Sequence, residues 1–125
     1  RLIKRDIDIA VSKYNITGMQ CAFIKYIYNK SLDGDVYAKD IESDFEMRRA
    51  SVTGILQLME KNNLIKRDEC VDQRLKKITL TKKALKIKDD IQKEIVEIEN
   101  KLKSNISKEN LEIFENVVEQ MIRNL

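Results

Sequence analysis

Several residue types are absent or scarce in this 125-residue chain, and each shortage excludes a class of protein. The chain has no histidine, so it lacks the commonest general base and the commonest zinc ligand. Its two cysteines, Cys21 and Cys70, follow no signal-peptide pattern, which favours reduced thiols and a cytoplasmic location. No apolar run is long enough to span a bilayer, so we expect no membrane partner. We also find no nucleophile–base pair, phosphate-binding loop or metal-ligand cluster, and therefore expect neither an enzyme nor a cofactor.

Proline is absent as well, so nothing forbids long helices. Apolar residues recur at three- and four-residue spacing along most of the chain, which is the pattern of amphipathic helices. The expected helices cover about 2–14, 18–29, 36–44, 48–62, 82–103 and 108–125. The expected N-cap residues are Thr17, Asp35, Thr81 and Ser107. Gln20 would complete a capping box with Thr17, and Asn63 suits the left-handed position after the fourth helix.

Two β-type runs, at about 64–67 and 76–81, follow the fourth helix, and the charged link between them carries Arg74 near its tip. A helix pair followed by such a hairpin is the outline of a winged helix-turn-helix. We therefore expect a mostly α fold with a small β-hairpin wing, in a single domain. Its DNA-binding lobe would cover about 30–83, and its long dimerisation helices about 1–15 and 84–125.

The charge of the chain is small overall but unevenly distributed. The net charge is +3, which by itself does not indicate nucleic acid. From Phe45 to Lys83, however, ten lysines and arginines stand against five acidic residues, so this segment carries +5 and the remainder −2. A basic centre between acidic flanks suits one surface that faces phosphate groups.

The two C-terminal helices have more apolar surface than a small winged helix can cover. Leu111, Phe114, Val118, Met121 and Leu125 follow one another at three- and four-residue spacing on the last helix. We expect this surplus to be buried against a second copy of the chain. The alternative is that these helices fold back on the first two within one chain.

The outward face of the fourth helix is expected to carry two very small residues, Ala50 and Gly54, one turn apart. A glycine inside a helix costs about 0.5–1 kcal/mol relative to alanine, so it calls for a reason. Close approach of another molecule is one reason, and a tolerated surface glycine is the alternative.

Residues 36–84 resemble the multiple-antibiotic-resistance regulator (MarR) family of winged-helix transcription factors. The helix-pair motif of the family is matched by Ile41, Phe45, Ser51-Val52-Thr53, Ile55-Leu56, Met59-Glu60-Lys61, Leu64-Ile65 and Arg67. Its wing motif is matched by Asp72, Arg74, Ile78, Leu80-Thr81 and Ala84. The sequence departs from the family pattern at three glycine positions, which here are Glu46, Asn63 and Ala84. The long helices after the wing extend the resemblance over essentially the whole chain.

The resemblance implies a homodimer that binds a pseudo-palindromic DNA operator and acts as a repressor, with the fourth helix in the major groove and the wing in a minor groove. The residues predicted to form the DNA surface are Arg48, Arg49, Ser51, Thr53, Gly54, Gln57, Asp72, Arg74, Lys76 and Lys77. Of these, Ser51, Thr53, Asp72 and Arg74 match positions of the family motif, whereas Arg48 stands where the family usually has a small polar residue. Arginines at the helix start can read guanine or hold phosphate, and an arginine in the wing suits a narrow minor groove. Asp72 would orient the wing, while the lysines, with Lys82 and Lys83, would attract phosphate.

Many members of the family respond to a small aromatic effector, which is therefore a further partner that the resemblance implies. Cys21 reads as a small hydrophobic residue on a buried helix, and Cys70 as an exposed thiol without a clear activating neighbour. The competing function is a winged helix that binds protein rather than a specific DNA sequence.

Overall fold

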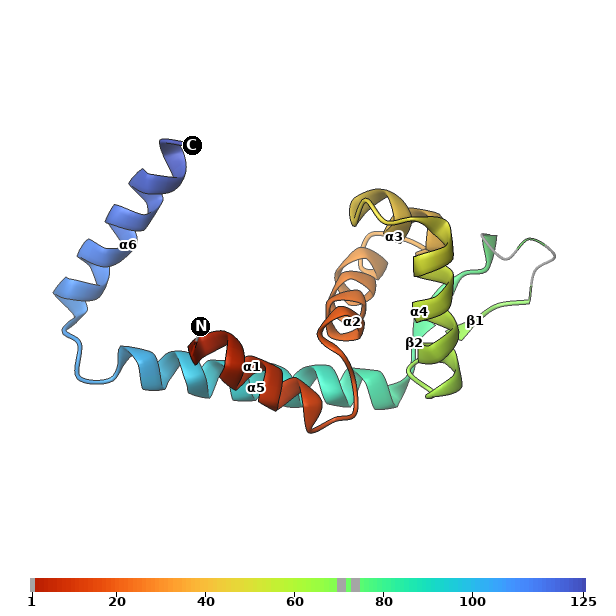
Figure 1. The fold of residues 1–125 in the computed structure, drawn as a ribbon, viewed down its shortest axis with the longest axis horizontal. Coiled ribbons are helices and arrows are strands. Elements are labelled where there is room, and N and C mark those ends of the chain that lie inside the picture. Colours follow the sequence, from red (N-terminus) through yellow and green to blue (C-terminus); the bar gives the residue numbers. More distant parts are fainter. Residues whose placement is uncertain (1, 70–71, 73–74) are drawn as a thin grey trace.

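A computed structural model describes residues 2–69, 72 and 75–125 of the chain, and Figure 1 shows their arrangement. The elements are α1 (Leu2–Ser12), α2 (Gly18–Ser31), α3 (Ala38–Asp44), α4 (Arg49–Lys61), β1 (Ile65–Arg67), β2 (Ile78–Leu80), α5 (Lys82–Lys103) and α6 (Lys108–Arg123). This order confirms the expected fold class, a mostly helical winged helix-turn-helix. No helix in the described ranges is long and apolar enough to cross a membrane.

Three of the four expected N-caps are confirmed. The Thr17 hydroxyl accepts a hydrogen bond from the Gln20 backbone N–H at 3.0 Å, and the Gln20 side chain accepts one from the Thr17 N–H at 3.1 Å. The hydroxyls of Thr81 and Ser107 each accept a hydrogen bond from the backbone N–H three residues on. The first helix ends two residues earlier than expected, before Asn15 with its left-handed φ of 58°.

The expected cap at Asp35 is wrong. Helix α3 begins at Ala38, its N-cap is Tyr37, and the Asp40 carboxylate accepts a hydrogen bond from the Tyr37 N–H at 2.9 Å. The physical reason lies next to Asp35, where the Val36 carbonyl accepts a hydrogen bond from the Ile78 N–H at 2.8 Å. This segment is therefore held beside the wing, and a helix cannot begin until the chain has left it.

The wing strands are shorter than expected. β1 and β2 are antiparallel, with Ile65 opposite Leu80, Lys66 opposite Thr79 and Arg67 opposite Ile78. The Asp68 N–H donates to the Lys77 carbonyl at 3.1 Å, so pairing continues one step beyond the strands. Residues 70, 71, 73 and 74 lie outside the described residues, and with them the expected roles of Cys70 and Arg74.

The hydrophobic core lies where α2, α3, α4 and the wing meet the first half of α5. Its fully buried side chains include Phe23, Ile27, Ile41, Leu56, Ile78 and Ile91. Cys21 is buried at its edge, as expected, and burial raises the pKa of its thiol, which keeps it protonated and unreactive.

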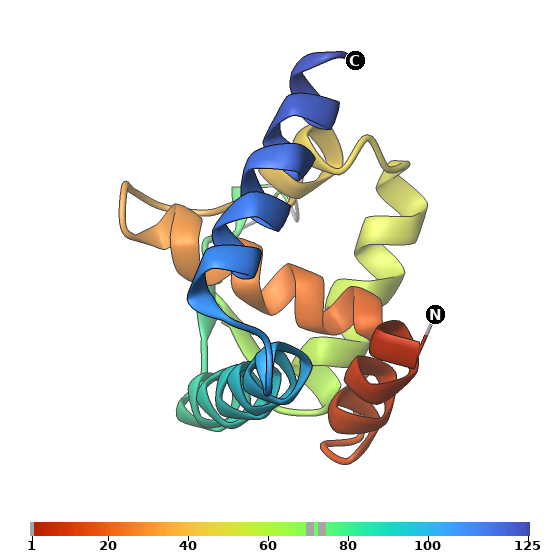
Figure 2. The ribbon, with the colours of Figure 1, turned by 90° about the vertical axis from the view of Figure 1, so that its left-hand side faces the viewer.

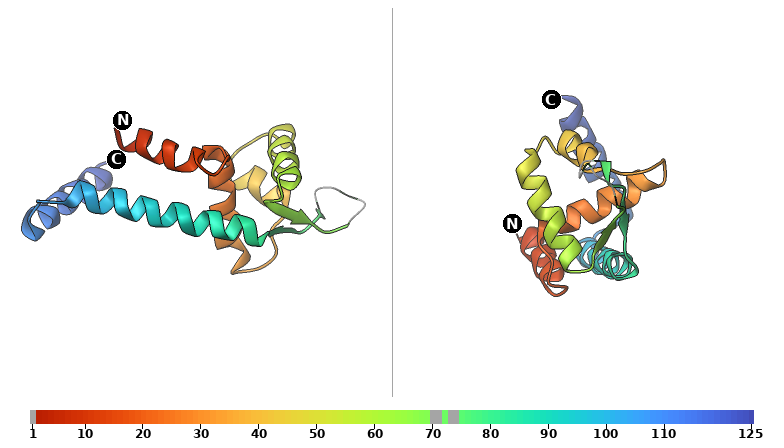
Figure 3. Two further views of the ribbon diagram at one scale, coloured as in Figure 1. Left: turned by 90° about the horizontal axis from the view of Figure 1, so that it is seen from below. Right: turned by 90° about the vertical axis from the view of Figure 1, so that its right-hand side faces the viewer.

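Helix α1 lies along α5 (Figures 2 and 3), whereas α6 stands apart from the lobe (Figure 1). The ammonium group of Lys13, which directly follows α1, and the carboxylate of Glu94 in α5 form an ion pair at 2.6 Å. Helix α6 buries none of its residues. The alternative that the two C-terminal helices fold back onto the first two therefore holds for α5, which packs on α1 and α2, and is wrong for α6.

Candidate nucleic-acid interface

The outer face of α4 gathers most of the residues expected at a DNA surface. Val52, Leu56 and Met59 are fully buried on one side of this helix and fix its rotation about its own axis. The opposite side is exposed or half-buried and carries Ala50, Ser51, Thr53, Gly54, Gln57 and Lys61. A Cβ atom placed on Gly54 would meet nothing within 4 Å. The protein itself therefore does not require glycine at this position.

Two arginines lie at the start of this helix. Arg48 is the N-cap residue, but its side chain makes no capping hydrogen bond. Arg48 and Arg49 are both exposed, and neither forms an ion pair within the described residues. Two exposed guanidinium groups next to a helix N-terminus, without an ion-pair partner among the described residues, form a positive corner. This corner lies beside the small face of α4.

The turn before α4 is built on the end of α3. The N–H groups of Phe45, Glu46 and Met47 donate to the carbonyls of Ile41, Ser43 and Glu42, at 2.9, 3.3 and 3.0 Å. Glu46 has a φ of 52°, in the left-handed region where glycine is favoured. This explains why the related pattern has glycine where this chain has Glu46, and it shows that the turn keeps its shape without one.

The other end of α4 is joined to the start of α5. Asn63 takes the expected left-handed conformation, with φ 61°. The Thr81 hydroxyl donates to the Asn63 carbonyl at 2.7 Å, and the Lys83 ammonium donates to the Asn62 carbonyl at 2.8 Å. A cation at this place also complements the dipole of α4. Sequence reasoning assigned Lys83 to general phosphate attraction and missed this contact.

Arg67 is a second residue whose role the sequence did not reveal. Its side chain is only 7% exposed, and its guanidinium contacts the Glu60 carboxylate at 3.1 Å. Because Arg67 lies in β1 and Glu60 in the last turn of α4, this pair joins the base of the wing to α4. Both residues belong to the family motif, and this match was the only sequence signal of their interaction.

The basic side chains of the wing lie in different surroundings. Lys77 is exposed, and its ammonium lies 3.5 Å from the Asp35 carboxylate, which offsets part of its charge. Lys76 is half-buried and Asp72 is exposed. Arg74, the most specific residue of the wing motif, is outside the described residues. Among the described residues, no group of three or more histidine, cysteine or acidic side chains could hold a metal ion.

These features define a winged helix-turn-helix in which α4 carries an exposed face of small residues next to two arginines. No protein-family model and no curated protein sequence matches the chain. Solved structures do match it. The transcription regulator MarR from Oenococcus oeni PSU-1 is 31% identical, with a TM-score of 0.62, over 98% of this chain and 90% of that one. The chain belongs to the MarR family of transcription regulators.

Two structures of one further regulator bear on the interface. MepR, a transcription regulator of the Staphylococcus aureus multidrug efflux pump MepA, is 24% identical with a TM-score of 0.85, over 98% of this chain and 89% of that one. In a MepR–DNA complex the identity is 25% and the TM-score 0.80, over 97% of this chain and 90% of that one. A fold of this kind therefore binds DNA in a protein of nearly the same length.

Proposed function

We propose that the chain is a sequence-specific DNA-binding transcriptional repressor that acts as a homodimer on a pseudo-palindromic operator. The observation that carries this proposal is the outer face of α4, which is small, exposed and flanked by Arg48 and Arg49. Two exposed arginines beside a helix face that starts with the small residues Ala50, Ser51 and Gly54 suit insertion into a major groove. The MepR–DNA complex supports the same use of the fold.

Each face residue has a role that its chemistry suggests. Arg48 and Arg49 would read guanine or hold phosphate, and the hydroxyls of Ser51 and Thr53 would contact bases or phosphates. Gly54 would let the DNA approach the helix closely, and this would bring Gln57 within reach of an adenine edge.

The wing would supply the remaining contacts. Arg74 would enter a minor groove, Asp72 would orient the wing, and Lys76 and Lys77 would neutralise phosphates. Lys77 would have to exchange its Asp35 partner for a phosphate, which an exposed ion pair permits at little cost.

The homodimer is supported by the exposed apolar surface of α6. Ile113, Phe114, Val117, Met121 and Ile122 are each more than half exposed. Monomeric proteins rarely leave so much contiguous apolar surface in water. A second copy of the chain that covers α6 would hold the two lobes at a fixed distance, as a palindromic operator requires.

A selection experiment tests the proposal. Duplexes with a randomised centre are incubated with the wild-type protein, and bound sequences are enriched over several rounds. We expect an inverted repeat whose affinity falls steeply with salt, since several phosphates would be neutralised. In the same assay Arg74→Ala should weaken binding by about 1–3 kcal/mol. Failure to enrich any sequence would instead favour a protein-binding winged helix. Response to a small aromatic effector stays a prediction from the family resemblance.

A further inference from the structure

We propose that Tyr26 is a positioning residue for the DNA-binding helix, because its hydroxyl and its ring fix the end of α3 from which the turn into α4 is built. This inference rests on the proposed function. It assigns part of the sequence specificity to a residue on α2, outside the helix-turn-helix and outside the wing.

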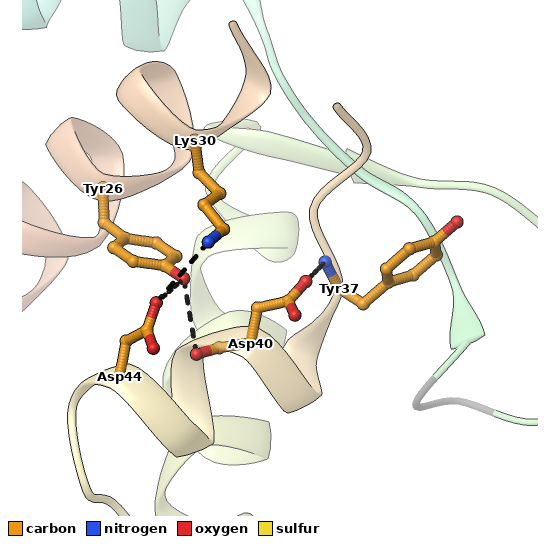
Figure 4. Close-up of polar contacts among 5 residues, drawn as sticks. All are labelled: Tyr26, Lys30, Tyr37, Asp40 and Asp44. Atoms are coloured by element: carbon orange, nitrogen blue, oxygen red, sulfur yellow. Dashed lines mark hydrogen bonds and ion pairs between the residues drawn. The ribbon is translucent and has the colours of Figure 1, made fainter. Parts of the chain in front are cut away.

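The hydroxyl of Tyr26 contacts two acceptors on α3, one in its first turn and one at its last residue (Figure 4). It donates a hydrogen bond to the Asp44 carboxylate, and it lies 3.4 Å from the Asp40 carbonyl oxygen. The Lys30 ammonium lies 3.9 Å from the same Asp44 oxygen. Asp44 is the last residue of α3, so one donor on α2 holds the point where that helix ends.

The ring of Tyr26 supports the same point by packing. It meets the Phe45 ring edge to face, with centroids 5.3 Å apart and planes at 75°. Phe45 in turn packs edge to face on Phe23, with centroids 5.0 Å apart. Since Phe45 directly follows α3, the first residue of the turn is held between two rings of α2.

The turn transmits this position to α4. Its three N–H groups, at Phe45, Glu46 and Met47, all donate back to carbonyls of α3. The left-handed Glu46 fixes the direction in which the chain leaves. The turn is therefore rigid relative to α3, and a change in the end of α3 reaches Arg48 and Arg49 directly.

The state of the hydroxyl is constant under physiological conditions. Partial burial and the nearby Asp44 carboxylate both raise the pKa of Tyr26. The side chain therefore stays protonated and remains a donor, so the contact does not depend on pH in the physiological range.

The test compares Tyr26→Phe with Tyr37→Phe. The first variant keeps the ring on Phe45 and removes the hydroxyl, and the second removes a hydroxyl that lies 3.5 Å from Asp35, away from the end of α3. The probes are the duplex selected by the wild-type protein and an unrelated duplex of the same length. For Tyr26→Phe we expect about tenfold weaker binding to the selected duplex, comparable to one impaired base contact. Binding to the unrelated duplex should stay within about twofold, since phosphate attraction does not depend on the angle of α4.

Two further variants test whether the acceptor at Asp44 is needed for the effect of the Tyr26 hydroxyl. Asp44→Asn keeps an acceptor oxygen for the Tyr26 hydroxyl and should retain most of the affinity, whereas Asp44→Ala should behave like Tyr26→Phe. Wild-type affinity in Tyr26→Phe, or an equal loss on both duplexes, would overturn the inference. If the wild-type protein selects no sequence, the proposed function itself fails, and that result is distinct from either of these.

Discussion

Substitution of Gly54 tests whether glycine at this position of α4 serves the fold or the binding of a partner. A methyl group at this position meets nothing within 4 Å in the chain. We therefore expect Gly54→Ala to raise the free energy of unfolding by about 0.5–1 kcal/mol, measured by urea denaturation. If DNA approaches the helix closely, the same variant should bind the selected duplex more weakly. A gain in stability with unchanged affinity would show that Gly54 is only a tolerated surface glycine.

Glu46 is the residue at which the turn departs from its usual sequence. Its φ of 52° strains a side chain with a Cβ atom, and its own side chain is exposed. We expect Glu46→Gly to raise the free energy of unfolding by about 0.5–1 kcal/mol, as relief of that strain exceeds the added freedom of the unfolded chain. Glu46→Ala is the matched control, since it removes the same carboxylate but keeps the Cβ. Equal stabilisation by both variants would locate the effect in the charge instead.

Single-residue roles were predictable where local chemistry decides them. The capping box at Thr17 and the left-handed Asn63 depend only on near neighbours, and both are confirmed. The cap at Asp35 was wrong because Val36, its neighbour, is held by Ile78, which lies some forty positions further along the chain. The contacts of Tyr26 with Asp44 depend in the same way on tertiary packing.

The junction between α4 and α5 joins the helix proposed to bind DNA to the long helix that follows the wing. The hydroxyl of Thr81, itself buried, accepts from the Ala84 N–H at 3.1 Å and donates to the Asn63 carbonyl at 2.7 Å. We expect Thr81→Val, which keeps the shape, to lower the free energy of unfolding by about 2 kcal/mol, since it removes both the cap and a buried hydrogen bond. Chemical denaturation measures this loss.

Thr81→Ser is the matched control, because it keeps the hydroxyl and removes only a methyl group. It should retain most of the stability. A loss as large as that of Thr81→Val would assign the effect to packing of the methyl group.

The helices and the wing were predictable to different degrees. Each expected helix is present because its apolar periodicity spans two turns or more. The wing strands are three residues each, and single backbone hydrogen bonds, from Asp68 to Lys77 and from Thr81 to Leu64, continue the pairing just beyond them. For the interface, periodicity alone placed Ala50, Gly54 and Gln57 on one face of α4. The contacts of Arg67 and Lys83 could not be predicted, because each joins two elements that are brought together only by the tertiary fold.

The position of α6 in the whole molecule could be predicted from the sequence only in part. Its apolar stripe predicted a surface that binds a partner, and in the structure this stripe is exposed. The angle at which α6 leaves α5 could not be predicted, because it is set at Ser104 and the left-handed Asn105 rather than by the stripe. An apolar cleft of about 490 Å³ opens at this corner, and Leu102, Ile106, Leu111 and Phe114 contribute to its lining.

Phe114 offers the sharpest test of the dimer. Its side chain is 65% exposed and lies at the apolar cleft between α5 and α6. Phe114→Glu should leave the lobe folded, since α6 contributes no buried residue to it, but should place a charge within the proposed dimer interface. We expect sedimentation to show a dimer for the wild type at micromolar concentration and a monomer for the variant.

Asn116→Glu is the matched control for this substitution, because it adds the same charge on the opposite, polar side of α6. It should remain a dimer. DNA binding provides the second measurement: a monomer can hold only one half of an inverted repeat, so Phe114→Glu should lose at least about a hundredfold in affinity for the full site. Its affinity for an isolated half-site should equal that of a single wild-type lobe. A wild-type protein that sediments as a monomer would contradict the dimer, and the exposed face of α6 would then have to bind a different partner.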